Sequence, residues 1–139
     1  MLSRLIYVSR ARSSLPLELK DILASSRKNN PRLGVSGAMC FIDGVYLQCL
    51  EGETTVVDAL YRQIEKDARH TVPKMLEKKS VSERAFPGWA MALLTWNDET
   101  KKVYGTFNPG SGLDVYQADP ATIEPLMRTW AATSNWMTL

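Results

Sequence analysis

Hydrophobic and polar positions alternate with a two-residue period at the start of the chain. In residues 2–9, Leu5 and Tyr7 fall on one side and Ile6 and Val8 on the other. The segment is also rich in β-branched and aromatic residues, which favour extended structure. We therefore predict a strand over residues 2–9.

A helical period follows this strand. Ser14, followed by Pro16 two residues later, is typical of a helix N-terminus, with the serine as cap and the proline in the first turn. Asn30 lies four residues after Ser26, so the inward side of the helix ends in two polar side chains. Pro31 is predicted to end the helix. The inward positions at this spacing are Leu15, Leu19, Ile22, Leu23 and Ser26.

Two further strands are predicted over residues 34–42 and 45–51. Asp43-Gly44 between them is a strong signal for a tight hairpin. Both faces of the second strand look at least half buried, so Gln48 lies among apolar side chains. An unpaired amide in a core costs about 1–3 kcal/mol, and Gln48 therefore needs a polar partner. The turn pairs Ile42 with Val45, Phe41 with Tyr46, and Met39 with Gln48.

The remaining periodicities complete a ferredoxin-like pattern. A helix is predicted from Thr54 to Ala68, capped by Thr54 or Thr55, and strands over 72–81 and 89–96 follow it. The order β-α-β-β-α-β-β predicts an α+β fold, with both helices on one face of a mixed sheet. The inner positions of the second helix are Val56, Val57, Leu60, Ile64 and Ala68.

The C-terminal part of the chain has a different composition. Asn97 to Asp119 is rich in Gly, Asn, Asp and Lys and is predicted to be a loop or connection. Asp119-Pro120 begins a helix whose apolar side must pack on the bare face of the sheet or on another subunit. We therefore divide the chain into residues 1–97 and a C-terminal extension, 98–139. The apolar positions of this helix are Ile123, Leu126, Met127, Trp130 and Ala131.

Composition narrows the classes of function. The chain has 17 Lys and Arg against 15 Asp and Glu, and no basic run, which argues against direct nucleic acid binding. No apolar stretch reaches the length of a membrane span or signal peptide, so a soluble cytoplasmic protein is expected. Cys40 and Cys49 lack metal-ligand spacing and are expected to be buried reduced thiols, with no metal site.

Three polar side chains in apolar surroundings need partners: Tyr7, Asn30 and Gln48. The predicted order places the first and third strands side by side, so Tyr7 and Gln48 can meet beneath the helices, with Asn30 above them. A planar heterocycle with edge carbonyls and ring nitrogens would satisfy the groups that remain. A satisfied core network or buried water is the alternative.

Four segments of the chain resemble the BLUF family, the blue-light sensors that use flavin. They are LIYVSRA, SSRKNNPRLGVSGAMCFIDGVYLQCLEG, IEKDARH and RAFPGWAMAL, and they occur in family order and spacing over residues 3–97. The resemblance implies a flavin chromophore, FAD in the first instance, with FMN and riboflavin left open.

The resemblance also implies roles for individual residues. Tyr7 matches the photoactive tyrosine that donates an electron, and Gln48 matches the glutamine that joins this phenol to the flavin. Asn30 matches the asparagine that binds the ring edge, with Asn29 and Ser26 beside it. The resemblance further implies that blue-light excitation leaves the Gln48 amide rearranged and shifts flavin absorption to the red.

Five further positions match less directly. Trp89 and Met91 match the tryptophan and methionine linked to signal output. Asp67, Arg69 and His70 lie where the family places polar residues near the side chain of the flavin. His70 could equally lie on the surface, and Arg69 could cap the preceding helix.

The expected output is mechanical rather than enzymatic. The signal is predicted to pass through the last strand and the C-terminal helix to a separate protein in trans, from a homo-oligomeric sensor. Two other functions stay open at this level: a flavin-free interaction module and an acylphosphatase-like enzyme using Arg10 or Arg12. The loop SRARSS, however, lacks the glycines that a phosphate cradle uses.

Overall fold

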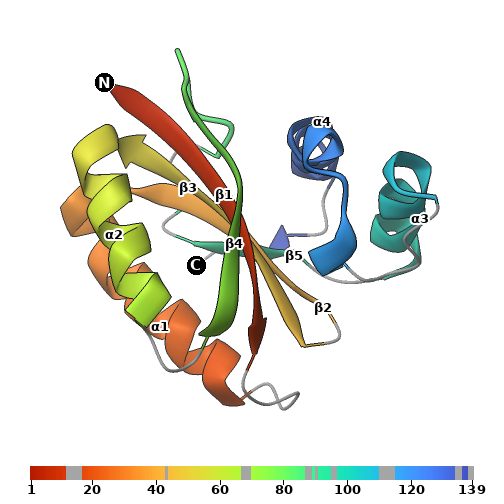
Figure 1. Ribbon diagram of the computed structural model, residues 1–139, viewed down its shortest axis with the longest axis horizontal. Coiled ribbons are helices and arrows are strands. Elements are labelled where there is room, and N and C mark those ends of the chain that lie inside the picture. The colour runs from red at the N-terminus through yellow and green to blue at the C-terminus, as the bar shows by residue number, and fades with distance from the viewer. Residues whose placement is uncertain are drawn as a thin grey trace.

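A computed structural model shows an α+β protein built on a mixed sheet (Figure 1). Helices α1 (Leu17–Leu33) and α2 (Thr54–Lys66) cover one face of the sheet, and α3 (Asp98–Phe107) and α4 (Pro120–Ala131) lie on the other side. The structure describes residues 1–11, 17–42, 44–66, 70–86, 89, 91–94, 97–109, 115–133 and 136–137, without the side chains of 11, 17–20, 70–72, 117 and 137. The strands are β1 (Leu2–Ala11), β2 (Ser36–Ile42), β3 (Val45–Glu53), β4 (His70–Ser80), β5 (Ala92–Leu94) and β6 (Trp136–Met137), and a short 3-10 helix, η1, spans Val115–Gln117.

The order of the strands in the sheet is β4-β1-β3-β2-β5-β6. The central pair, β1 and β3, is antiparallel, and β5 joins β2 in parallel. This is the predicted ferredoxin-like order extended by one strand, so the predicted fold class is confirmed. The predicted hairpin register is confirmed as well, because Ile42 lies opposite Val45 and Met39 lies opposite Gln48.

The sheet is buried on both faces. Every residue of β3 from Val45 to Gly52 is buried, as the apolar character of both its faces predicted. The core beneath α1 and α2 contains Leu5, Tyr7, Ile22, Leu23, Val35, Met39, Tyr46, Leu50, Val57, Tyr61 and Met91. The core beneath α4 contains Ile6, Val8, Leu47, Cys49, Phe86, Ile123, Leu126, Met127 and Trp130, among others. Cys40 and Cys49 are buried free thiols, as predicted.

Helix α1 does not end at Pro31 as predicted, but continues to Leu33. A proline within a helix removes one amide bond and crowds the carbonyl four residues earlier, but the carbonyls of Asn30 and Pro31 are bound by the chain that follows, which stabilises the last turn of α1. Val35 N donates to the carbonyl of Asn30 (2.9 Å), and Gly34 has φ 68. This left-handed glycine ends the helix. The predicted helix start at Ser14 lies outside the described residues.

The predicted loop from Asn97 to Asp119 is wrong in its first half, which forms α3. Asn97 and Thr100 form a capping box, each side chain bonded to the backbone of the other. Asp98 and Glu99 in the first turn complement the helix dipole. Composition concealed this helix, because the residues typical of loops are also those that cap helices.

The predicted strand over 89–96 begins too early. Strand β5 is Ala92–Leu94, and Trp89 and Met91 precede it, while the predicted end at residues 95–96 lies outside the described residues. The carbonyl of Trp89 nevertheless accepts a bond from Gly37 N (2.9 Å), so the segment stays attached to β2.

Thr54 is the first residue of α2 rather than its flanking cap, and its hydroxyl donates to the Met1 carbonyl (2.9 Å).

Helix α4 forms where predicted and packs on the sheet. Asp119 caps it by accepting from Ala121 N (3.0 Å), and Pro120 opens it. Its predicted apolar side faces the core beneath α4, on the face of the sheet opposite α1 and α2. The division of the chain at residue 97 stays a prediction. None of the helices in the described part of the chain is long and apolar enough to cross a bilayer.

Two glycines allow a matched test of this packing. A Cβ at Gly37 would lie 2.1 Å from the Cys49 carbonyl oxygen, whereas a Cβ at Gly105 in α3 would meet nothing within 4 Å. Gly37→Ala should therefore destabilise the protein by about 1–3 kcal/mol or more. Gly105→Ala should stabilise it by about 0.5–1 kcal/mol. Urea unfolding of both variants measures these changes, and equal unfolding midpoints would contradict the close approach of β2 and β3.

Candidate functional site

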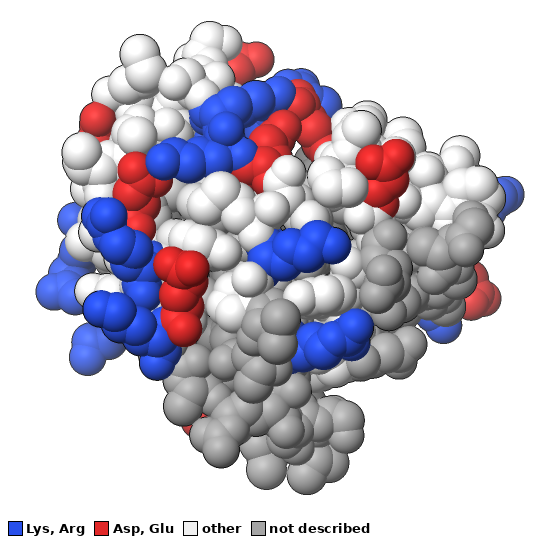
Figure 2. All heavy atoms as spheres, in the orientation of Figure 1, with Lys and Arg blue, Asp and Glu red and all other residues white. Residues whose placement is uncertain are grey.

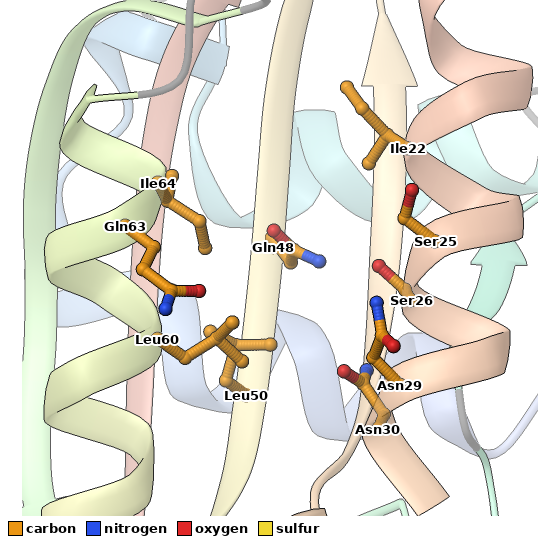
Figure 3. Close-up of a pocket in the computed structure, with 10 residues that line it drawn as sticks. All are labelled: Ile22, Ser25, Ser26, Asn29, Asn30, Gln48, Leu50, Leu60, Gln63 and Ile64. Carbon is orange, nitrogen blue, oxygen red and sulfur yellow. The ribbon is translucent and has the colours of Figure 1, made fainter.

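A cavity of about 150 Å³ opens between α1 and α2, above β3 (Figure 3). Figure 3 shows the lining side chains of the two helices facing each other across it, with Gln48 between them. None of the ten lining residues is charged. They are Ile22, Ser25, Ser26, Asn29, Asn30, Gln48, Leu50, Leu60, Gln63 and Ile64.

Gln48, which lines the cavity, is the middle member of a chain of three buried side chains. Tyr7 and Gln48 lie directly opposite each other on β1 and β3, and the Tyr7 hydroxyl donates to Gln48 Oε1. Gln48 Nε2 in turn donates to Met91 Sδ (3.5 Å). All three residues are at most 3% exposed. The structure thus brings Tyr7 and Gln48 together as the strand order predicted, and Met91 joins them at the other end of the amide.

The polar wall of the cavity belongs to α1. Ser26 and Asn30 are one helical turn apart and both line the cavity, as their spacing indicated. Asn30 is 3% exposed, whereas Asn29 is only partly buried and its Oδ1 accepts a bond from Arg32 Nη2 (2.7 Å). Asn30 is therefore the more sheltered of the two amides.

Trp89 and Met91 lie on opposite sides of the sheet. Met91 belongs to the core beneath α1 and α2, and its carbonyl accepts from Arg27 Nε (3.2 Å). The ring of Trp89 packs on the other side, with its centroid 5.4 Å from those of Phe86 and Trp136. Of the two residues predicted near the glutamine, the structure brings only Met91 to it.

The other predicted group cannot be placed. Asp67 and Arg69 lie outside the described residues, and only the backbone of His70, the first residue of β4, is described. Their proximity to the cavity stays a prediction. Among the described residues, no group of three or more His, Cys, Asp and Glu side chains could hold a metal ion.

Three residues near the site were missed at the level of sequence. Tyr61 on α2 meets the Tyr7 ring edge-on, with the ring centroids 5.4 Å apart and the planes at 62°. Burial, together with the charge of Glu65, raises the pKa of the Tyr61 phenol. Ser25 and Gln63 line the cavity. Tyr61 follows Val57 by four residues and Gln63 follows Leu60 by three, so helical spacing carried a signal for both.

The lining suits a flat ring with a polar edge. Ile22 of α1 and Leu60 and Ile64 of α2 offer apolar surface on opposite walls, where ring faces can pack. The amides of Asn30 and Gln48 offer both donors and acceptors to ring carbonyls and nitrogens. A neutral heterocycle with edge carbonyls, as the sequence predicted, fits this set of groups.

Comparison with known proteins points in the same direction. The model of one protein family, described as "BLUF: Sensors of blue-light using FAD", matches residues 2–92. Photoactivated adenylate cyclase subunit beta of Euglena longa is 31% identical over 109 residues. The match covers 78% of this chain but 12% of that protein, so the chain spans only a small part of the curated relative.

Two solved structures resemble nearly the whole chain. The ground state of BlsA has a TM-score of 0.87 at 28% identity, covering 97% of this chain and 91% of the other. BlrB, a BLUF protein in its dark state, has a TM-score of 0.76 at 30% identity, covering 94% and 96%. The likeness therefore extends beyond residue 92 into the C-terminal helices.

Proposed function

Because the chain belongs to the BLUF family of flavin-based blue-light sensors, we propose that the cavity between α1 and α2 holds the ring of FAD. The buried chain Tyr7–Gln48–Met91, whose central residue Gln48 lines the cavity, is the observation that carries this proposal. Asn30, Asn29 and Ser26 supply polar groups for the ring edge, and Ile22 and Leu60 supply apolar surface for its faces. FMN and riboflavin carry the same ring, and FAD is preferred because the family is described by it.

Bound flavin supplies absorption of blue light and, once excited, a strong electron acceptor. Tyr7 is the electron donor in this proposal, because its phenol is fully buried and bonded to Gln48, which lines the cavity. A phenol that loses an electron becomes a strong acid. The Tyr7 hydroxyl already donates to Gln48 Oε1, so this bond would give its proton a path to the amide, and a path back to the phenol when the electron returns to Tyr7.

Gln48 converts this proton movement into a structural change. Its amide presents an acceptor, Oε1, to Tyr7 and a donor, Nε2, to Met91 Sδ. If the amide rearranged so that its oxygen faced Met91, two acceptors, Gln48 Oε1 and Met91 Sδ, would meet with no hydrogen between them. Met91 would then have to move, and with it the short segment that leads into β5.

We propose that the output passes from this segment to the second face of the sheet. Trp89 lies two residues before Met91, and its ring packs against Phe86 and Trp136 on that second face. Trp136 belongs to β6, which pairs with β5. Helix α4 and its surroundings are the surface that would change for a partner. The proposed receiver is a separate protein bound in trans to a homo-oligomeric sensor, and the proposed sensor has no catalytic activity of its own.

The upper part of one face of the molecule gives no support to nucleic acid binding. On the face drawn in Figure 2, basic side chains in the upper part are interleaved with acidic ones. Nucleic acid binding calls for a continuous basic track.

Location in the cytoplasm stays a prediction.

The acylphosphatase-like alternative gains no support. It requires an arginine in a phosphate-binding loop after β1, and Arg12 lies outside the described residues. The Arg10 guanidinium lies 4.4 Å from the centroid of the Tyr116 ring, so it is already engaged in a cation–π contact.

The primary test is an absorption spectrum of the purified protein reconstituted with FAD. We expect a flavin band in the dark that shifts to the red under blue light and recovers in darkness. Bound flavin without the shift would contradict the photochemical part of the proposal. A protein that remains colourless after reconstitution would contradict the flavin site itself.

Substitutions at Tyr7 and Gln48 separate flavin binding from photochemistry. Gln48→Leu and Tyr7→Phe should keep flavin bound, because the cavity walls remain, but should abolish the red shift by breaking the Tyr7–Gln48 bond. Tyr61→Phe is the matched control, since Tyr61 touches Tyr7 through its ring and has no bond to Gln48 in the structure. It should retain the shift. A normal red shift in Gln48→Leu would exclude the mechanism.

Flavin affinity should depend more on Asn30 than on its neighbour. Asn30→Ala should weaken binding by about 1–3 kcal/mol, because it leaves polar groups of the ring edge unpaired. This corresponds to a Kd higher by about fivefold to 150-fold. Asn29→Ala should have a smaller effect, because the Asn29 amide is partly exposed and bonded to Arg32. Fluorescence titration with FAD measures both, and the reverse ranking would refute the assignment.

A further inference from the structure

The core beneath α4 contains a group of charges that the proposed photochemistry does not use. Arg4 of β1 is 3% exposed and Glu51 of β3 is fully buried. Ionic groups buried this deeply are costly unless each is paired. Their partners show which parts of the structure these two residues connect.

Glu51 holds the segment that leads to Trp89 and Met91. Its two carboxylate oxygens accept from the backbone amides of Ala85 (2.8 Å) and Phe86 (2.9 Å). Arg84 adds a bond to the carbonyl of Glu51 itself (2.9 Å). Residues 84–86 are thus bound to the end of β3, three residues beyond Gln48 on the same strand. The position of this segment and that of the Glu51 carboxylate depend on each other.

Besides its apolar packing, helix α4 makes ion pairs with the described part of the sheet through one carboxylate. Glu124 is the only acidic residue of α4, and it pairs with Arg4 Nη2 (3.1 Å) and with the ammonium of Lys79. Arg128, one turn further along α4, contacts the same carboxylate from the solvent side (3.1 Å). The hydrogen bond from Lys79 is the main cause that lowers the pKa of Glu124 to about 2, so the group is charged at neutral pH.

Arg4 is common to both sets of contacts. Its Nε donates a hydrogen bond to Glu77 Oε2 (3.3 Å), whereas its contacts with the other two carboxylates are ion pairs: Nη1 lies 3.8 Å from Glu51 Oε2, and Nη2, which forms no hydrogen bond within the described part of the chain, lies 3.1 Å from Glu124 Oε1. The N–H groups of a guanidinium form a rigid fork, so it cannot move toward one carboxylate without changing its geometry at the other. We propose that Arg4 couples the segment carrying Trp89 and Met91 to helix α4, by sharing its guanidinium between Glu51 and Glu124.

The inference rests on the proposed function in its light-dependent part. A change at Gln48 that displaces Met91 would also shift residues 84–86. Because the Glu51 carboxylate contacts both these residues and Arg4, this shift would change the contact between Arg4 and Glu124. The coupling itself exists in the dark as well. Because coupling between two sites is reciprocal, a change on α4 must also be felt at the amides of Ala85 and Phe86.

Amide hydrogen exchange of the FAD-bound protein, followed by NMR in the dark, tests the coupling directly. Glu124→Gln keeps the shape of the side chain and removes its charge from a partly exposed position. It should raise exchange at Ala85 and Phe86 by about threefold or more, although neither residue lies on α4. Arg128→Gln is the matched control, because Arg128 bonds to Glu124 from an exposed position and forms no ion pair with Glu51 among the described residues, and it should change these rates by less than about twofold.

A double-mutant cycle distinguishes coupling through Arg4 from simple shielding by α4. Arg4→Lys leaves a positive charge for Glu51 but removes the fork, so the variant is expected to fold. If Arg4 carries the coupling, Arg4→Lys with Glu124→Gln will raise exchange at Ala85 and Phe86 no more than the larger single effect. Rates that multiply in the double variant, or that stay unchanged in Glu124→Gln, would overturn the inference.

Illumination provides the second readout. We expect the α4 amides of the unsubstituted protein to change exchange under blue light, and this difference to fall below about half in Arg4→Lys, with the flavin red shift intact. A full light-dependent difference in Arg4→Lys would overturn the role of Arg4. Absence of the red shift in the unsubstituted protein would instead refute the proposed photochemistry, and the dark experiment would still decide on the coupling.

Discussion

The amide of Gln48 imposes the main constraint on this structure. A glutamine in the middle of a sheet that is buried on both faces must have partners for both ends of its amide. Tyr7 serves the oxygen and Met91 sulfur serves the nitrogen, and the second of these is a weak acceptor. One end of the amide is therefore held firmly and the other loosely. This inequality suits a group that must hold one arrangement at rest and adopt another when its strong partner changes.

The two faces of the sheet have different roles that follow from strand geometry. Side chains alternate along β1 and β3, so Tyr7 and Gln48 face α1 and α2, whereas Arg4 and Glu51 face α4. The first face has neutral polar groups around a cavity, and the second has an apolar core with a buried ion pair. A sheet exposed on one side could not connect them, because the second face would be solvated and its ion pair screened.

Much of this arrangement could be predicted from the sequence. The Asp43-Gly44 turn fixed the hairpin register, and the order of elements placed Tyr7 beside Gln48, because both depend on local patterns and a small set of topologies. The direction of Met91 and Trp89 could not be predicted in this way. They precede a three-residue strand, where tertiary contacts decide which side chain points to which face. Helix α3 was missed because its capping residues are also typical of loops. The ion pairs of Arg4 were missed because its partners, Glu51, Glu77 and Glu124, belong to three other elements.

The parity of β3 has a consequence for how sequences of this kind can change. Gln48 and Glu51 are an odd number of residues apart, about 10 Å along one strand, and so face opposite sides. Inserting or deleting one residue between them would turn Glu51 toward the cavity and leave a carboxylate beside the chromophore. Substitutions can accumulate along this strand, but its length between these two positions cannot drift by one. Related chains that preserve both faces should therefore differ here in residue identity and not in spacing.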